Sequence, residues 1–311
     1  MADTKIEWAD KVWNPVTGCT KVSPGCKNCY AERMALRLKA MGQPRYANGF
    51  AVTTHEDALT IPLRWRKPRR IFVNSMSDLF HQDVPDEFID RVFAVMALCT
   101  QHTFQVLTKR PERMAAWFQR YSDLGDEDPV LGDTGIGNCL NGPRENLMRD
   151  SGVLPGGSQK WRWNAAEMDY HEPWRVAISG YFDWLGDESE RPIQWPLPNV
   201  IPGATVEQDA YIWRLDKILK VPAALHFVSF EPLLGQINAA PYLDKIGWVI
   251  VGCESGPKRR HTDIDWIRSL RDQCQAAGVP FLLKQMDVGG RVVKMPMLDG
   301  RVWDEVPEVL R

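Results

Sequence analysis

The chain has 311 residues, of which 44% are hydrophobic, so it can bury a sizeable core as one large domain or two small ones. Its formal net charge of −2 does not indicate a nucleic-acid partner, and any such contact would need a local basic patch. There is no run of about 18 apolar residues and no signal-peptide core, so we expect a cytoplasmic protein without a membrane partner.

Short apolar runs, typical of buried strands, alternate with longer helix-type patterns in the first part of the chain. Pro85 and Asp86 mark the start of one helix, and Pro111 lies in the first turn of the next. In chain order we expect a strand near Trp13, a helix over 30–42, a strand over 70–76, a helix over 85–99, a strand over 104–108 and a helix over 111–121.

The same alternation returns after a long interruption. Residues 122–198 are rich in Gly, Asp, Asn and Trp, contain one candidate strand over 175–182, and are interpreted as an inserted lid or subdomain. Beyond it we expect strands over 199–206, 225–230, 247–252 and 279–285, with helices over 208–219 and 263–278.

Strand–helix alternation of this kind predicts an α/β fold with a parallel sheet. With about seven strands, we expect a partial (β/α) TIM-type barrel with a long insertion, built as a single domain over residues 1–311. A doubly wound open sheet is the alternative.

Three cysteines lie within one short loop, Cys19, Cys26 and Cys29, with the spacing C-x6-C-x2-C. Seven cysteines without an export signal favour metal or redox chemistry over disulfides. A 4Fe–4S cluster held by three cysteines would keep one iron open for a small molecule. The alternative is zinc, which usually takes four ligands in a structural site, with the fourth from His55, His81 or Cys99.

Polar side chains follow almost every predicted strand. The carboxyl ends of barrel strands are where catalytic groups collect, so these residues are candidates for the site, although polar residues also simply begin loops. As catalytic residues we predict Glu231, Glu254 and Lys284. Further polar residues at strand ends are Ser75, Ser77, Asp78, Glu207 and Ser229.

Basic residues cluster around Trp65 in the run RWRKPRR over 64–70, and again over 258–261 and at Lys109 and Arg110. A basic segment with an aromatic side chain can bind a phosphate backbone and stack a base, although it can also be a solvated turn. We therefore expect a nucleic acid or nucleotide as substrate, with a peptide or small metabolite as alternatives.

Six runs carry a family resemblance: WNPVTGCTKVSPGCKNCYAERM, PLRWRKPRRIFVNSMSDLFH, VLTKRPERM, FVSFEPLLG, WVIVGCESG and SLRDQCQAAGVPFLLKQ. The chain resembles a phage and bacterial family of uncharacterised proteins with a three-cysteine motif. That family is placed in the radical S-adenosylmethionine (SAM) superfamily, near spore photoproduct lyase. The resemblance implies a partial barrel with a 4Fe–4S cluster on Cys19, Cys26 and Cys29, and SAM on the open iron.

The implied chemistry is reductive cleavage of SAM to a 5′-deoxyadenosyl radical, which abstracts hydrogen from a substrate to modify or repair it, as in DNA repair. The electron would come from a reductant such as flavodoxin or ferredoxin. By position in the barrel, the resemblance places the SAM amino group at Ser75, Ser77 and Asp78, and its ribose or carboxylate at Glu207 and Ser229. Tyr30, beside the third cysteine, is a further cofactor-binding candidate.

Two departures from the superfamily pattern keep alternatives open. The common spacing is C-x3-C-x2-C, and the aromatic residue that usually precedes the third cysteine is Asn28 here. One alternative is a relative that binds cluster and SAM but performs non-radical chemistry. Another is a non-catalytic iron–sulfur or zinc protein that binds nucleic acid.

Overall fold

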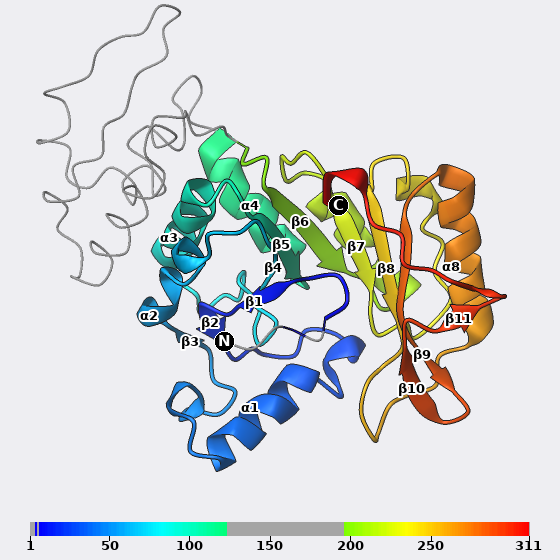
Figure 1. The fold of residues 1–311 in the computed structure, drawn as a ribbon, viewed down its shortest axis with the longest axis horizontal. Coiled ribbons are helices and arrows are strands. Elements are labelled where there is room, and N and C mark those ends of the chain that lie inside the picture. The colour runs from blue at the N-terminus through cyan, green and yellow to red at the C-terminus, as the bar shows by residue number, and fades with distance from the viewer. Residues whose placement is uncertain (1–3, 5, 123–195, 311) are drawn as a thin grey trace, which may run out of the picture.

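A curled sheet of eight strands organises the computed structural model, which describes residues 4, 6–122 and 196–310 (Figure 1). Seven strands are parallel, and the eighth, β10, pairs antiparallel with β9. In sheet order they are β1 (Lys11–Trp13), β4 (Arg70–Val73), β5 (Thr103–Thr108), β6 (Val200–Thr205), β7 (Phe227–Phe230), β8 (Trp248–Gly252), β9 (Phe281–Val288) and β10 (Arg291–Lys294). The fold is a mixed α/β half barrel.

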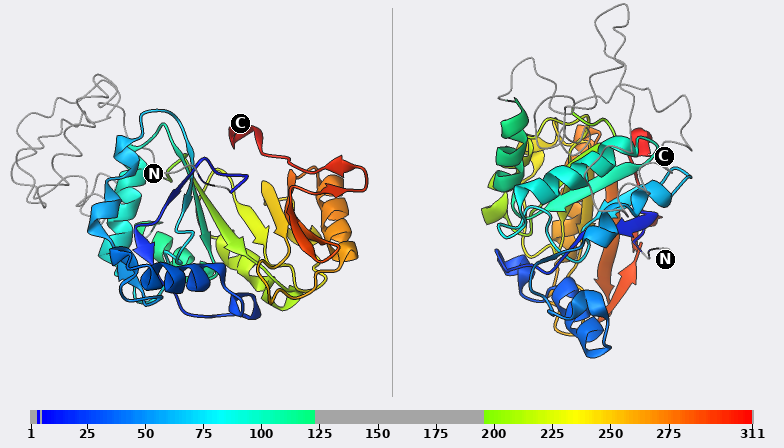
Figure 2. Two further views of the ribbon diagram at one scale, coloured as in Figure 1. Left: turned by 60° about the horizontal axis from the view of Figure 1, so that its bottom comes forward. Right: turned by 90° about the vertical axis from the view of Figure 1, so that its left-hand side faces the viewer.

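Helices cover the convex side of this sheet, and α1 lies beside the carboxyl ends of its strands (Figures 1 and 2). The helices are α1 (Tyr30–Ala40), α2 (Glu56–Leu59), α3 (Asp86–Leu98), α4 (Pro111–Ser122), α7 (Trp213–Ile218) and α8 (Ile264–Ala277). Two small antiparallel pairs lie outside the main sheet: β2 (Val16–Thr17) with β3 (Thr53–Thr54), and β11 (Met297–Leu298) with β12 (Arg301–Val302). Within the described ranges, no helix is long and apolar enough to cross a membrane.

The parallel strands follow one another through the sheet in chain order. The predicted α/β class with a parallel sheet is confirmed, and the curl of the sheet is compatible with a partial barrel. A doubly wound sheet would reverse its strand order at a switch point, and this sheet has no such reversal. The predicted insertion over 122–198 and its strand over 175–182 lie almost wholly outside the described residues.

Three local differences from the predicted elements have physical reasons. Strand β4 ends at Val73 because Asn74 has a left-handed φ of 60°, so the apolar run predicted to reach 76 turns out of the sheet. The helix predicted over 208–219 divides into a 3-10 turn, Asp209–Tyr211, and the short α7. Strand β10 has a mostly exposed face without an apolar run, which is why its sequence did not indicate it.

The strands of the sheet are closely packed, and β6 is buried along its whole length. Gly203 in β6 shows how tight this packing is, since a Cβ added there would lie 2.3 Å from the Phe227 ring of β7. Helix α8 matches its prediction closely: the Asp263 side chain accepts from the Asp265 backbone N–H at its start, and Gly278 is left-handed at its end.

Four histidines in the described structure have lowered pKa values, and burial is the largest cause for each: His55, His81, His102 and His226. A lowered folded-state pKa means that the unfolded chain binds more protons below about pH 6.5, so acidification favours unfolding. We expect the melting temperature to fall as the pH goes from 7.5 to 5.5, above the range in which carboxylates titrate. A melting temperature that rises over this interval would contradict the assignment.

Candidate functional site

A cavity of about 290 Å³ opens at the carboxyl edge of the sheet, between the cysteine loop and the strand ends. Most of the residues predicted for the site line it: Cys19, Cys26, Cys29, Tyr30, Ser75, Ser77, Asp78, Glu231, Glu254 and Lys284. The other two predicted residues, Glu207 and Ser229, do not line the cavity, and both are buried. Residues far apart in sequence thus meet at one place, as parallel strands require.

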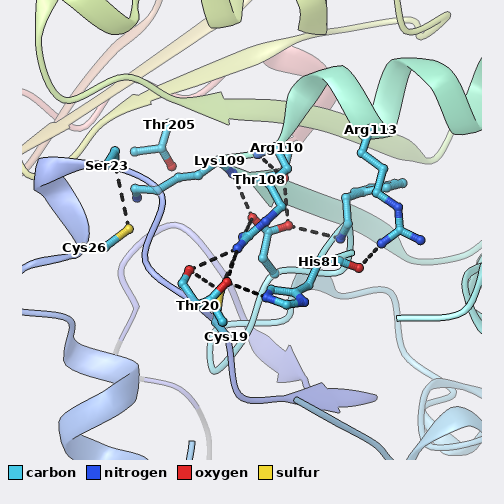
Figure 3. Close-up of polar contacts among 12 residues, drawn as sticks. Cys19, Thr20, Ser23, Cys26, His81, Thr108, Lys109, Arg110, Arg113 and Thr205 are labelled. Carbon is cyan, nitrogen blue, oxygen red and sulfur yellow. Dashed lines mark hydrogen bonds and ion pairs between the residues drawn. The ribbon is translucent and has the colours of Figure 1, made fainter. Parts of the chain in front are cut away.

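The three cysteines come from different parts of one loop. Cys19 follows β2, Cys26 ends a 3-10 turn that begins at Pro24, and Cys29 precedes α1. All three are free thiols that are partly exposed, and the Cys26 sulfur lies 3.7 Å from the Ser23 hydroxyl (Figure 3). In the part of the chain that the structure describes, no three His, Cys, Asp or Glu side chains are grouped as ligands of one metal ion.

Arg110 joins the cysteine loop to the ends of β4 and β5 (Figure 3). Its Nη1 donates to the Cys19 sulfur at 3.4 Å and to Asp78 Oδ2 at 3.1 Å, while its Nη2 donates to both oxygens of Thr20 at 3.0 Å. Asp78 also accepts from the Thr108 hydroxyl at 2.7 Å. Arg110 is buried, so this charged pair is shielded from water and fixes the direction of the Cys19 side chain.

Burial raises the pKa of the Cys19 thiol to about 11, and the charge of Asp78 adds to this effect. The guanidinium of Arg110 acts in the opposite direction, because a neighbouring positive charge favours the thiolate. A cation bound to this sulfur would favour the thiolate for the same reason, and metal ligation requires that form.

Glu207 holds the middle of the loop from below. Its Oε1 accepts from the Gly25 backbone N–H at 3.3 Å, and its Oε2 accepts from Arg214 at 2.8 Å. Neither Glu207 nor Arg214 is more than 2% exposed. The predicted contact of Glu207 with the ribose or carboxylate of SAM stays a prediction, while the contact seen here is to the cysteine loop.

Glu254 holds the far end of the loop. Its carboxylate accepts from the Asn28 side chain at 2.8 Å and forms an ion pair with Arg260. These hydrogen bonds with Arg260 and Asn28 keep the Glu254 pKa below its usual value, although burial opposes them. Glu254 therefore lines the cavity as an ionised, already bonded carboxylate.

Glu231 and Lys284 lie side by side in the lining of the cavity. Lys284 Nζ donates to Glu231 Oε2 at 2.6 Å, and both side chains are partly exposed. The second oxygen, Oε1, is buried without a hydrogen-bond partner among the described residues, and it lies 2.7 Å from where a Cβ on Gly252 would be. The pair is a carboxylate and an ammonium in contact, which can pass a proton to or from a bound molecule.

The serines predicted to contact SAM already have local partners. The Ser77 hydroxyl donates to the Val16 carbonyl at 2.8 Å, and the Ser75 hydroxyl donates to Asn14 at 3.3 Å. None of the alternative zinc ligands His55, His81 and Cys99 lines the cavity. Sequence reasoning did not single out Asn28 or Cys253 as cavity residues, and no local pattern marks them.

The basic run over 64–70 lies away from this cavity. It leads into β4, whose first residue is Arg70, so it lies at the amino edge of the sheet, whereas the cavity is at the carboxyl edge. Trp65 packs partly buried against the core, with its ring centroid 6.1 Å from that of His102. This run therefore does not line the cavity, and its binding to a phosphate backbone stays a prediction.

No curated protein and no solved structure is similar enough to match the chain. A protein-family model does match, and it spans residues 3–307, including the cysteine loop and every strand of the sheet. The chain therefore belongs to the DUF5131 family, a protein family of unknown function.

Proposed function

We propose that the protein is a radical SAM enzyme built on a partial TIM-type barrel, which binds a 4Fe–4S cluster on Cys19, Cys26 and Cys29 and modifies or repairs a nucleic acid or nucleotide. The observation that carries the proposal is that three free thiols of one loop line the cavity at the carboxyl edge of the sheet. The resemblance of this loop to the three-cysteine motif of that superfamily supports the same conclusion.

The donor set suits a cluster. In a 4Fe–4S cluster each cysteine binds a different iron, so the sulfurs need not converge on one point as they do around zinc. The loop is held from three sides, by Arg110, Glu207 and Glu254, which limits the entropy lost on ligation. When bound, the cluster with SAM would supply the electron for reductive cleavage of the sulfonium.

The chain's own residues have separate tasks in this proposal. Arg110 directs the Cys19 thiolate and places a positive charge beside it. The Glu231–Lys284 pair, which also lines the cavity, can hold or move a proton on the substrate. Asp78 is fully engaged with Arg110 and Thr108, so its part is to support the loop.

Anaerobic reconstitution tests the proposal directly. We expect about four irons and four sulfides per chain, and 5′-deoxyadenosine when SAM and dithionite or reduced flavodoxin are added. A cluster that binds SAM without releasing 5′-deoxyadenosine above a no-enzyme control would indicate non-radical chemistry. Stoichiometric zinc without iron or SAM cleavage would leave a structural metal site and overturn the proposal.

A further inference from the structure

Positive charge is concentrated in two segments of the chain from which other residues line the cavity. Between Cys19 and Ala40 the chain has five basic residues and one acidic residue, although the whole chain has a net charge of −2. The loop between β8 and α8 adds Lys258, Arg259 and Arg260 within four positions that contain no acidic residue. This local excess is the electrostatic feature that contact with a polyanion requires.

The first turns of α1 and the β8–α8 loop lie against each other. Arg33 Nη2 donates to the Ser255 carbonyl at 3.2 Å, and the Asn28 side chain donates to the Lys258 carbonyl at 2.8 Å. Arg37 follows Arg33 by one helical turn, so both extend from the same face of α1. We call Lys27, Arg33, Arg37 and Lys258 the cationic rim.

Neighbouring carboxylates do not neutralise this rim. Glu32 pairs with Lys21 at 3.0 Å, Asp287 pairs with Arg259 at 2.6 Å, and Glu254 pairs with Arg260. Among the described residues, Lys27, Arg37 and Lys258 form no ion pair, and all three are exposed. Their charges are therefore available to an anion from outside.

An aromatic side chain stands within the rim. Tyr30 lines the cavity and is 53% exposed, so its ring is accessible to a bound molecule. Aromatic faces between cations are how proteins hold unpaired bases, because every base has a face that can stack.

We propose that the cationic rim binds the phosphate backbone of a single-stranded nucleic acid and presents one base over Tyr30 to the cavity. The identity of the reaction on that base rests on the proposed function, but the binding surface does not. A single strand fits better than a duplex, because a cavity of this size admits only a base that has left its stack.

Two triple variants of equal charge change test the surface by fluorescence anisotropy with labelled single-stranded DNA and RNA. The rim variant is Lys27→Gln/Arg37→Gln/Lys258→Gln. The control, Arg66→Gln/Lys67→Gln/Arg69→Gln, removes the same charge from the amino edge of the sheet. We expect the rim variant to weaken binding at about 0.1 M salt by about tenfold or more and to lower the slope of log K against log salt by about 2, with the control unchanged.

Thermal melts establish that both variants fold. Equal weakening by both variants would overturn the inference in favour of general charge attraction. So would loss confined to the control variant, tighter binding of duplex than of single strand, or equal competition by polyglutamate. Rim-dependent binding without 5′-deoxyadenosine formation would support the binding surface and contradict the proposed chemistry. Formation of 5′-deoxyadenosine without rim-dependent binding would contradict only the binding surface.

Discussion

Replacing Cys26 by alanine is expected to abolish both the reconstituted iron–sulfur absorbance and SAM cleavage. A three-cysteine cluster has no spare protein ligand, so the loss of one thiolate leaves a second iron unbound. Cys19→Ala and Cys29→Ala should behave in the same way, because each sulfur lines the same cavity. Iron and sulfide analysis, with the visible spectrum of the anaerobic protein, measures the effect.

Cys253→Ala is the matched control, since Cys253 is the fourth cysteine that lines the cavity. Its side chain is only 2% exposed and follows β8, whereas the three cysteines of the loop are partly exposed and lie together in the sequence. We expect this variant to keep about four irons. A cluster lost from Cys253→Ala would mean four cysteine ligands and no open iron, and full iron in Cys26→Ala would remove the ligand assignment itself.

Replacing Arg214 by methionine is expected to lower the free energy of unfolding by about 3–5 kcal/mol, because it leaves the Glu207 carboxylate buried without its charged partner. Both side chains are almost completely buried, and their atoms are 2.8 Å apart. Arg214 also donates to the Thr205 carbonyl at 2.8 Å and lies 4.5 Å from the Tyr211 ring centroid. Urea unfolding followed by circular dichroism measures the change.

An exposed ion pair gives the comparison. Arg45→Met removes the partner of Asp57, whose side chain is 72% exposed, and this should cost less than about 1 kcal/mol. If both variants lost a similar free energy of unfolding, burial would not be the reason that the Glu207–Arg214 pair stabilises the fold. An Arg214→Met variant with the same urea midpoint as the native protein would contradict the prediction.

Much of the fold follows from patterns within the chain. The strands over 70–73, 104–108, 227–230 and 248–252 are short, mostly apolar runs, so their hydrophobicity alone indicates them. Their consecutive order makes the polar residues that follow them neighbours, which is why strand ends alone predict that Ser77, Glu231 and Lys284 lie at one site, and all three line the cavity.

Contacts across long sequence separations could not be predicted in the same way. The sequence indicates neither that Glu207 pairs with Arg214 nor that it accepts from the Gly25 backbone N–H, 182 positions away. The run over 64–70 has the charge of a binding segment, but only the direction of β4 shows that it faces the other edge. The conformation of Asn74, which ends β4 early, depends on its backbone and not on hydrophobicity.

The cysteine loop is synthesised well before the residues that hold it. Arg110, Glu207 and Glu254 contact the loop across separations of 91, 182 and 226 positions. During synthesis the three thiols therefore remain without their full support until the segment that carries Glu254 has left the ribosome. Maturation of the site is a late event, and truncated chains that end before β8 should leave the cysteines accessible to oxidation and to competing metals.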